Sequence, residues 1–462
     1  MTESIWSQTA EIPERTPLNG DKRVEAAVIG AGMAGVLTAY LLKERGYSVA
    51  VLEADRIGRG QTRNTTAKIT SQHGLIYQDF IRMYGEKQAG LYAQAQEGAI
   101  WEYERIIREK KIECHFERLP AYLYSALESN REKLKQEAEA AARLGLPAHY
   151  LEEINLPGEL AGAGAVRFDN QAQFHPLEFI RELSKDLTIY EKTKVLSVKE
   201  NRIVTARGTV TAKYVIFASH YPFQNLPGLY FARQHQERSY VIAYEGGSLA
   251  ETLAGMYYSI DAGGLSLRSW GKFLLVGGSG HRTGKNEPGG RYLALQRAAE
   301  SYFPDGQQMG REAARWSAQD CMPHDRLPFI GRYSVLSPDW YVASGFQKWG
   351  MTSSMVSAML IRDEICGIKN PYEKLFSPQR LHPAAAAKDF AVDMWESMKG
   401  LARGFLLLFG KKEKARRCPH MGCGLRWNPD EESWDCPCHG SRFDRQGHIL
   451  DDPAQTSLRG GR

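Results

Sequence analysis

The sequence predicts an α/β protein that ends in a small β module (fold class α/β plus β), and three observations lead to this prediction. The chain has 462 residues, enough for two or three domains. Near its start, an apolar run is followed by closely spaced glycines and a helical pattern. Near its end, four of the seven cysteines lie between Cys418 and Cys438, beside two histidines. This local cluster indicates a metal-type site rather than the disulfide framework of a small secreted protein.

Composition and charge exclude several classes of protein. The net charge of +5 is small for this length and no long Lys/Arg block occurs, so nucleic acid is not an expected partner. The first twenty residues lack a basic start followed by an apolar run, and no stretch reaches the ~18 apolar residues of a membrane span. We therefore expect a cytoplasmic protein.

The opening motif has the layout of a dinucleotide site. Residues 23–29 form a strand pattern, Gly30, Gly32 and Gly35 follow, and a helical pattern then runs to a second strand that ends in Glu53. The three glycines allow a tight turn, close approach of a pyrophosphate and close helix–strand packing, while Glu53 can accept hydrogen bonds from a ribose. An acid at this position disfavours NADP, whereas the motif leaves FAD and NAD open. The alternative is a glycine turn in an ordinary α/β unit.

Two further segments resemble a known family. The stretch RIGRGQTRNTTAKITSQHG (residues 56–74) resembles the loop after the second strand in D-amino-acid-oxidase-like (DAO) FAD oxidoreductases. The stretch DRLPFIGRYSVLSPDWYVASGFQKWGMTSS (residues 325–354) resembles the last flavin-binding segment of that family. The resemblance implies FAD as the cofactor. It adds the following cofactor-binding candidates: Thr65, Thr66, Gly350, Met351 and Thr352.

The closing motif pairs cysteine with histidine twice, as Cys418-x-His420 and Cys436-x-x-His439. Two cysteines and two histidines also suit a structural zinc ion, but the order and the short gaps are unlike those of a zinc finger. The two boxes resemble those of Rieske [2Fe–2S] proteins.

The Rieske resemblance implies a role for each residue. Cys418 and Cys436 would bind one iron, and His420 and His439 the other. A disulfide would join Cys423 to Cys438. Ser441 could donate a hydrogen bond to a cluster sulfide. Phe443 stands where strongly hydrogen-bonded Rieske sites have tyrosine, so we expect a lower reduction potential. The module is short for an independent core and is expected to depend on a neighbouring domain, a partner or the cluster.

Together the two resemblances imply a domain organisation. The FAD-binding domain would comprise residues 21–85, 165–235 and 321–370, and an inserted α+β substrate domain residues 86–164 and 236–320. A linker helix (371–417) would precede the Rieske module (418–462).

The linker has an amphipathic helical pattern, with Phe390, Met394, Met398, Leu401 and Phe405 on one face. The favoured expectation is that this face packs against the flavin domain. A helix on a membrane surface is the alternative, because the apolar run FLLLFG is followed by the basic run KKEKARR.

Substrate-binding candidates are few. Arg268 could pair with a substrate carboxylate. Five histidines are expected to be structural, and Cys321 is expected to be a buried, unreactive thiol. The histidines are His73, His175, His220, His281 and His324.

The implied function is that of an FAD-dependent dehydrogenase. It would oxidise the C–N bond of a small amine or amino acid by hydride transfer to FAD, and electrons would pass singly through the Rieske cluster to an external acceptor, either a carrier protein or a quinone. The alternative is a flavin and iron–sulfur protein for electron transfer or redox sensing, without a small-molecule substrate.

Overall fold

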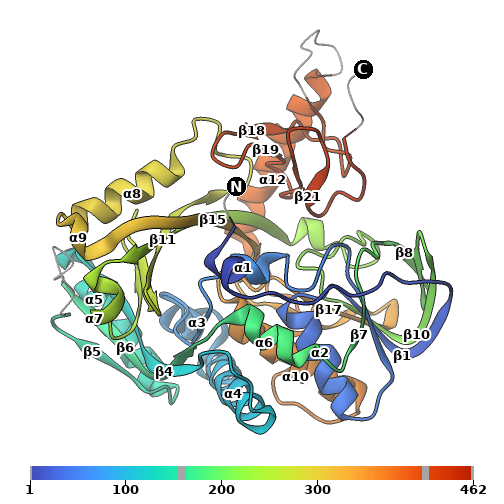
Figure 1. The fold of residues 1–462 in the computed structure, drawn as a ribbon, viewed down its shortest axis with the longest axis horizontal. Coiled ribbons are helices and arrows are strands. Elements are labelled where there is room, and N and C mark those ends of the chain that lie inside the picture. Colours follow the sequence, from blue (N-terminus) through green and yellow to red (C-terminus); the bar gives the residue numbers. More distant parts are fainter. Residues whose placement is uncertain (1–2, 155–162, 408–415, 459–462) are drawn as a thin grey trace.

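The computed structural model describes residues 3–154, 163–407 and 416–458. Two large sheets, each with its own helices, lie beside each other, and the C-terminal module sits above them (Figure 1). None of the helices in these ranges combines the length and the apolar character that crossing a bilayer requires.

The first sheet carries the opening motif. Its central strands β17, β10, β1, β2 and β7 are parallel neighbours, as expected for strands that are buried on both faces. β16 pairs antiparallel with β17 at one edge, β9 pairs antiparallel with β10, and β8 pairs antiparallel with β9. The strands are β1 (Lys22–Ile29), β2 (Val49–Leu52), β7 (Thr188–Tyr190), β8 (Val195–Lys199), β9 (Arg202–Thr205), β10 (Gly208–Phe217), β16 (Phe329–Ser334) and β17 (Ser337–Ser344).

Two helices of this part of the molecule are buried on nearly every side. α2 (Met33–Glu44) has ten consecutive buried residues, and α10 (Gly350–Ile365) is buried over most of its length against α2. Helices that are buried all round lie in the interior of a large domain. The remaining helices around this part are α1 (Ile5–Thr9), α3 (Tyr77–Tyr84), α4 (Glu86–Lys110), α6 (Pro176–Leu183) and α11 (Glu373–Phe376).

The second sheet is mainly antiparallel and runs in the order β15-β11-β14-β13-β12-β4-β6-β3, with β5 beside β6. Its strands are β3 (Lys68–Ile69), β4 (Glu117–Ser125), β5 (Ala148–Leu151), β6 (Gly164–Gln173), β11 (Gln234–Gly246), β12 (Met256–Ser259), β13 (Ser266–Trp270), β14 (Phe273–Arg282) and β15 (Gly310–Pro323). α5 (Arg131–Arg143), α7 (Ser248–Thr252), α8 (Arg291–Tyr302) and α9 (Gly306–Met309) accompany it.

Sheet membership differs from the predicted domain boundaries for two strands. β6 lies almost entirely within the segment 165–235 that was assigned to the FAD-binding domain, but it pairs with β4 in the second sheet. The short strand β3, in the assigned segment 21–85, pairs with β6 and belongs to the same sheet. An antiparallel partner distant in the chain determines the placement of β6, which the apolar pattern of a strand does not reveal. The division into domains otherwise stays a prediction.

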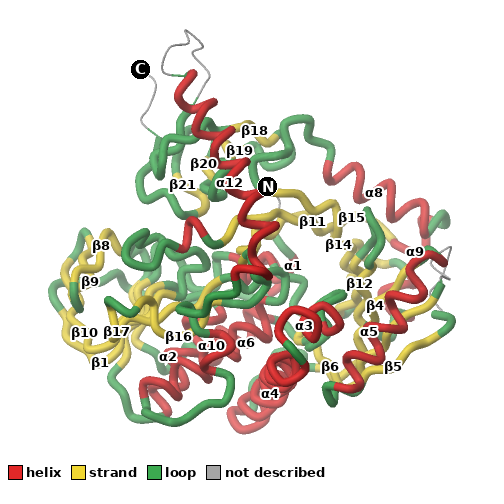
Figure 2. The backbone as a smooth tube through the Cα atoms, turned by 180° about the vertical axis from the view of Figure 1, so that it is seen from behind, coloured by secondary structure: helices red, strands yellow, loops and turns green. Residues whose placement is uncertain are grey.

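The C-terminal part consists of a long helix and a small sheet. α12 (Pro383–Leu406) runs along the outside of the molecule, and its C-terminal end extends beyond both large domains (Figure 2). The module beside it has four short antiparallel strands: β18 (Arg426–Asn428), β19 (Ser433–Asp435), β20 (Arg442–Phe443) and β21 (Ile449–Asp451). The segment 408–415 between them lies outside the described residues.

The prediction for the linker helix is wrong in its orientation. Phe390, Met394, Met398, Leu401 and Phe405 are 41–59% exposed, whereas Asp393, Glu396, Gly400 and Gly404 are the buried residues of α12. The helix packs on the protein through its polar and small residues, because these find partners on distant strands.

Candidate functional site

The glycine turn between β1 and α2 has the close packing that its spacing predicts. Gly30 has φ +105°, and a Cβ atom there would lie 2.6 Å from the carbonyl oxygen of Ala218. A Cβ atom on Gly35 would lie 1.9 Å from the carbonyl oxygen of Gly30. Gly32 is the N-cap of α2, so the helix N-terminus opens directly above the turn. The backbone cradle for a pyrophosphate is therefore present.

Glu53 lies next to this turn at the end of β2. Its carboxylate accepts the N–H groups of Ala31 at 2.7 Å and Asp55 at 2.8 Å. Burial raises the pKa of Glu53, although these two hydrogen bonds oppose the effect. The carboxylate is thus fixed beside the glycine turn, where the ribose of a dinucleotide would lie.

The other cofactor candidates come from two distant segments. The carbonyl oxygen of Thr65 accepts the Trp6 Nε1–H at 2.7 Å, and that of Thr66 accepts a hydrogen bond from Arg268. The Thr352 hydroxyl donates to the carbonyl oxygen of Thr70 at 3.2 Å, which ties α10 to the loop that contains both threonines.

Space is open beside the first residue of α10, because a Cβ atom on Gly350 would meet no atom within 4 Å. The carbonyl oxygen of Met351 accepts a hydrogen bond from the Tyr103 hydroxyl at 3.0 Å. A free helix N-terminus stabilises negative charge. These segments fit the group that the sequence implies, FAD, with a phosphate end at Gly30–Gly35 and a ring end near Gly350–Thr352.

Arg268 on β13 is fully buried and only partly satisfied. Its Nη1 donates to the Thr66 carbonyl, but among the described residues its Nε and Nη2 have no hydrogen-bond partner. Burial lowers the pKa of Arg268 to about 9. Such a buried cation with unused donors is well suited to a carboxylate.

A second cation, the half-buried Lys68, lies close to Arg268. The Lys68 amine donates to the carbonyl oxygen of Tyr257 at 2.8 Å and to the Ser266 hydroxyl at 2.6 Å. Burial, and then the charge of Arg268, lower the pKa of Lys68 to about 7. An anion bound here would relieve the repulsion between the two cations.

In the C-terminal module, the two ligand loops come together. Cys423 and Cys438 form a disulfide. The sulfurs of Cys423, Cys436 and Cys438 lie within 4.8 Å of one another, but the disulfide leaves Cys436 as the only metal-binding thiol of these three. The side chains of Cys418 and Cys436 are hydrogen-bonded to each other.

The two histidines face each other across the same site. Their ring centroids are 5.0 Å apart, and among the described residues the Nδ1 atoms of His420 and His439 are buried without a hydrogen-bond partner. Burial lowers the pKa of His420 to about 4 and that of His439 to about 3, so both rings are neutral. Neutral imidazoles with unused nitrogens fit a metal centre.

The two thiols are paired with each other. A hydrogen bond with Cys436, followed by backbone N–H groups and the Ser441 side chain, outweighs burial and lowers the pKa of Cys418 to about 7, whereas the same hydrogen bond and burial raise the pKa of Cys436 well above its usual value. The Ser441 oxygen also accepts the N–H of Ala454 at 3.0 Å. Phe443 is fully buried in β20 and brings no hydroxyl to the site. The donor set therefore fits a [2Fe–2S] cluster with two thiolate and two imidazole ligands.

The module is held against the larger domains by buried polar side chains. Gln236 donates to the carbonyl oxygen of His439 at 2.7 Å, and Gln319 to that of Gly440 at 2.9 Å. Arg238 on β11 pairs with Glu431 of the module at 2.9 Å, and Arg442 lies 3.4 Å from the same carboxylate. The expectation that the module depends on its neighbours agrees with these contacts.

The edge of the module that carries His420 and His439 faces the segment between β10 and β11, with His439 buried and His420 half-buried. His420 Nε2 lies 3.0 Å from Asn225 Oδ1, and the ring of Phe231 lies 6.2 Å from His420 and 5.7 Å from His439. Asn225 and Phe231 belong to the segment between β10 and β11.

The other histidines and Cys321 contact groups of the protein, and their structural role stays a prediction. His73 contacts the Tyr92 hydroxyl at 2.6 Å, and His175 caps α6. Cys321 is buried and lies 3.4 Å from His220 Nε2. His281 contacts the Tyr240 hydroxyl at 3.0 Å, and His324 bonds to Asp393 of α12.

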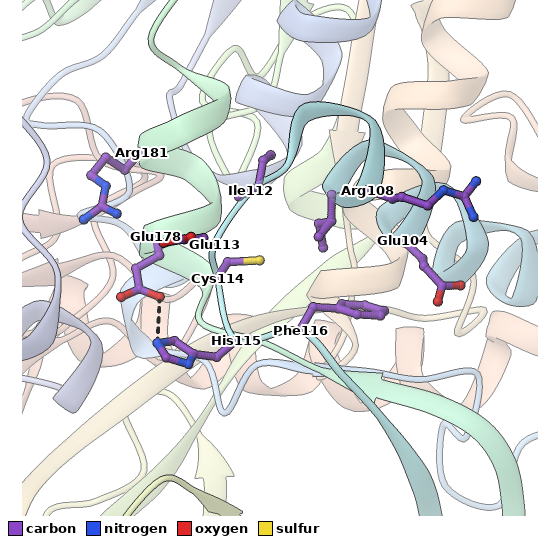
Figure 3. A pocket seen from close by; sticks show the side chains of 10 residues that line it. Glu104, Arg108, Ile112, Glu113, Cys114, His115, Phe116, Glu178 and Arg181 are labelled. Atoms are coloured by element: carbon purple, nitrogen blue, oxygen red, sulfur yellow. Dashed lines mark ion pairs between the residues drawn. The ribbon is translucent and has the colours of Figure 1, made fainter.

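A surface pocket of about 680 Å³ lies away from these sites (Figure 3). Arg108, Cys114, His115, Glu178 and Arg181 are among the residues that line it, and His115 approaches Glu178 at 3.6 Å. None of the site residues predicted from the sequence lines this pocket, so we do not assign it to the cofactor or substrate sites.

Sequence reasoning did not single out Lys68, Asn225, Phe231 or Gln236. Lys68 carried a signal, because a lysine stands directly after Thr65-Thr66-Ala67 in the flavin-type loop. The other three lie in segments without a motif, and only the docking of the module gives them a role.

Comparison with known proteins agrees with this geometry. The family model "FAD dependent oxidoreductase" (DAO) matches residues 25–364, and the model "Rieske [2Fe-2S] domain" matches residues 411–460. A putative Rieske 2Fe-2S iron-sulfur protein, YhfW, from Bacillus subtilis is 34% identical over 99% of this chain and 97% of its own length. Gamma-glutamylputrescine oxidoreductase from Escherichia coli is 25% identical over 76% of this chain and 85% of its own length.

Solved structures show the same fold. The glycine oxidase of Geobacillus kaustophilus superposes with a TM-score of 0.65 at 19% identity, covering 78% of this chain and 99% of that chain. Both family predictions are thereby confirmed, together with FAD and a [2Fe–2S] cluster as cofactors. The chain belongs to the DAO family of FAD-dependent oxidoreductases and carries a C-terminal Rieske [2Fe–2S] domain.

Proposed function

We propose that this oxidoreductase is a dehydrogenase for the C–N bond of a small amine or amino acid, and that its electrons leave through the Rieske domain to an external acceptor, either a carrier protein or a quinone. The observation that carries the proposal is the orientation of the Rieske domain, whose two histidines contact Asn225 and Phe231 in the segment between β10 and β11, next to the sheet with the glycine turn. Bound FAD takes up two electrons as a hydride, and a [2Fe–2S] cluster takes up one.

The positions of the candidate residues support their proposed cofactor-binding roles. Gly30, Gly32 and Gly35 offer backbone and helix dipole to the pyrophosphate, and Glu53 offers a fixed carboxylate to the ribose. The loop that contains Thr65 and Thr66 would lie beside the flavin ring. Gly350, Met351 and Thr352 place the open N-terminus of α10 where negative charge is stabilised.

In the Rieske domain, Cys418 and Cys436 would hold one iron and His420 and His439 the other. The two unused Nδ1 atoms support this assignment, because buried ring nitrogens without partners are rare. Ser441 keeps a hydroxyl proton available, since its oxygen accepts from Ala454. The Cys423–Cys438 disulfide would fix the distance between the two loops.

Substrate binding is assigned to Arg268, with Lys68 beside it. The two unused donors of Arg268 can clamp a carboxylate, which would orient the adjacent C–N bond. The names of two similar proteins, a glycine oxidase and a gamma-glutamylputrescine oxidoreductase, favour amino acids and amines as the substrate class.

We also propose a cytoplasmic location. Cys114, Cys321 and Cys366 are free thiols, which is typical of proteins in a reducing compartment.

An anaerobic substrate screen tests the proposal. The purified protein is mixed without oxygen with amino acids and with amines that lack a carboxylate, and bleaching of the flavin absorbance is followed. We expect bleaching by at least one member of this set. If the flavin is reduced by dithionite but by no amine or amino acid, the dehydrogenase proposal fails, and an electron-transfer or redox-sensing protein remains.

A further inference from the structure

α12 presents its most apolar side to the surface of the protein. Eight large apolar side chains on this side are 41–68% exposed. We call them the outward face of α12: Phe390, Val392, Met394, Trp395, Met398, Leu401, Phe405 and Leu406. We propose that this outward face is a docking surface for an anionic lipid bilayer, independent of the reaction proposed above.

The helix cannot turn this face inward, because its other side is fixed by buried polar contacts. Asp393 accepts hydrogen bonds from His235 at 3.0 Å and from His324, and pairs with Arg282. Glu396 pairs with Lys285 at 2.8 Å. Rotating the helix about its axis would separate the Asp393 carboxylate from His235, His324 and Arg282 and would leave buried polar groups without partners.

Two glycines complete the fixed side. A Cβ atom on Gly400 would lie 2.4 Å from the Cys438 sulfur, and one on Gly404 would lie 2.0 Å from the carbonyl oxygen of Gly422. The backbone of α12 therefore rests directly on the ligand loops of the Rieske domain, and the N–H of Gly424 donates to the carbonyl oxygen of Gly400 at 2.9 Å.

The acidic and basic residues of α12 are also divided between its two sides. Asp389, Asp393 and Glu396 lie on the half that is turned toward the protein, where Asp393 and Glu396 are buried and Asp389 is half-buried. Lys388, Lys399 and Arg403 are exposed at the margin of the outward face, where Lys399 also pairs with Glu396 at 2.6 Å and Arg403 with Glu287 at 3.2 Å.

This distribution matches an anionic bilayer. An amphipathic helix with aromatic and aliphatic side chains on one face and basic residues at its margin binds the interface of such a membrane. The amine of Lys399 lies 5.5 Å from the centre of the Trp395 ring, an arrangement suited to the headgroup region.

A second copy of the chain fits this face less well. In a two-fold dimer the same patch comes from both subunits, so Lys388, Lys399 and Arg403 of both copies would meet at one interface without an acid on the outward face. The end of α12 also extends beyond the large domains, which makes it accessible to a flat surface (Figure 2).

Docking would have a consequence for the position of the Rieske domain. The Cys423–Cys438 disulfide lies on the opposite side of α12 from the outward face, next to Gly400. The ligand loops would then lie about 10 Å from the membrane surface, the diameter of one helix.

Vesicle sedimentation tests the proposal with the full-length holoprotein. Binding is measured to vesicles of 70% phosphatidylcholine and 30% phosphatidylglycerol and to pure phosphatidylcholine. The test variant is Met394→Glu/Met398→Glu, and the matched control is Val335→Glu/Leu336→Glu, which changes two side chains that are 79% and 80% exposed elsewhere. All variants are first checked for flavin and iron content.

We expect the wild type and the control to bind anionic vesicles at least tenfold more tightly than neutral ones, and the test variant to lose at least tenfold in affinity. Equal binding by the test variant, or no binding of the wild type to either vesicle, would overturn the proposal. So would a stable wild-type dimer in sedimentation velocity that the test variant converts to monomers, because the face would then cover a second copy. Substrate-dependent flavin bleaching, measured on the same samples, is expected to be unchanged, so failure here is distinct from failure of the proposed reaction.

Discussion

The two cofactor sites of this chain are built in opposite ways. The candidate cluster ligands all lie between Cys418 and His439, in two loops joined by a disulfide, and the Nδ1 atoms of both histidines have no hydrogen-bond partner among the described residues. The candidate flavin site collects segments from Gly30 to Thr352, and its polar side chains, such as Glu53, already bond to the protein. A cluster is thus held by a few local side chains, whereas a dinucleotide is held by backbone that only the complete fold brings together.

Loss of one thiol is expected to have the largest effect. Cys436→Ser should abolish iron binding, because serine does not replace a thiolate ligand, while FAD content should stay at the wild-type level. Iron analysis and the flavin absorbance of the same sample measure both. Cys366→Ser, at a free cysteine away from the module, is the control and should retain both cofactors. Loss of FAD together with iron would show that the two sites are not separate.

A methyl group at the glycine turn should have the opposite effect on the two cofactors, with FAD lost and iron retained. In Gly35→Ala the new Cβ would overlap the Gly30 carbonyl, so we expect loss of FAD and a destabilisation of about 3 kcal/mol, with the iron retained. Gly98→Ala in α4 is the matched control, since a Cβ there meets no atom within 4 Å, and should stabilise the protein by about 1 kcal/mol. Chemical denaturation and cofactor analysis would check both. Full FAD occupancy in Gly35→Ala would contradict the assignment of the turn.

Arg268 tests whether the flavin site also recognises a carboxylate. Arg268→Met should lower kcat/KM for an amino acid about 100-fold, because two charge-assisted hydrogen bonds are lost. For an amine without a carboxylate the change should be small. Arg268→Lys should recover part of the loss. Equal losses for both substrate types would show that Arg268 has only a structural role.

The contact between α12 and the larger domains should respond to pH. Although burial opposes ionisation, hydrogen bonds from His235 and His324 and the charge of Arg282 hold the pKa of Asp393 well below its usual range. Its contribution to stability is therefore present above pH ~4 and is lost as the pH falls further. Burial alone would lower the pKa of His235, but the hydrogen bonds that its ring donates to Asp393 and Glu237 raise it, so its contribution is complete below pH ~6.5 and is lost as the pH rises through the raised value.

Asp393→Asn should consequently destabilise the protein most between pH ~4 and pH ~6.5, by about 3 kcal/mol near pH 5.5 and by less near pH 8. Denaturation curves at several pH values measure the difference. Lys388→Gln, at an exposed position of the same helix, should cost little at any pH. A pH-independent difference for Asp393→Asn would contradict the ion-pair account of how α12 is held.

The sequence predicted the local parts of both sites and missed their surroundings. The turn at Gly30–Gly35 and the pairing of Cys423 with Cys438 lie where the motifs placed them, because each depends on residues close in the chain. Asn225 and Gln236 could not be predicted as part of the site, because their partners His420 and His439 lie 195 and 203 residues further along the chain.

The orientation of α12 shows why pattern alone was insufficient. Hydropathy predicts that an apolar face packs inward, but Asp393 meets two histidines and an arginine from three different strands or loops, and Gly400 lets the backbone approach the disulfide. These partners are invisible in the sequence of the helix. The same is true of β6, whose partner β4 decided which sheet it joined.

The central claim is that electrons from the substrate reach the Rieske site within one chain. The most direct measurement mixes the protein anaerobically with a substrate that bleaches its flavin, freezes samples over time and records EPR spectra. The account predicts that a His-ligated [2Fe–2S] signal develops after flavin bleaching without any added mediator, and is missing in Cys436→Ser. A bleached flavin beside a cluster that stays EPR-silent until a mediator is added would contradict it.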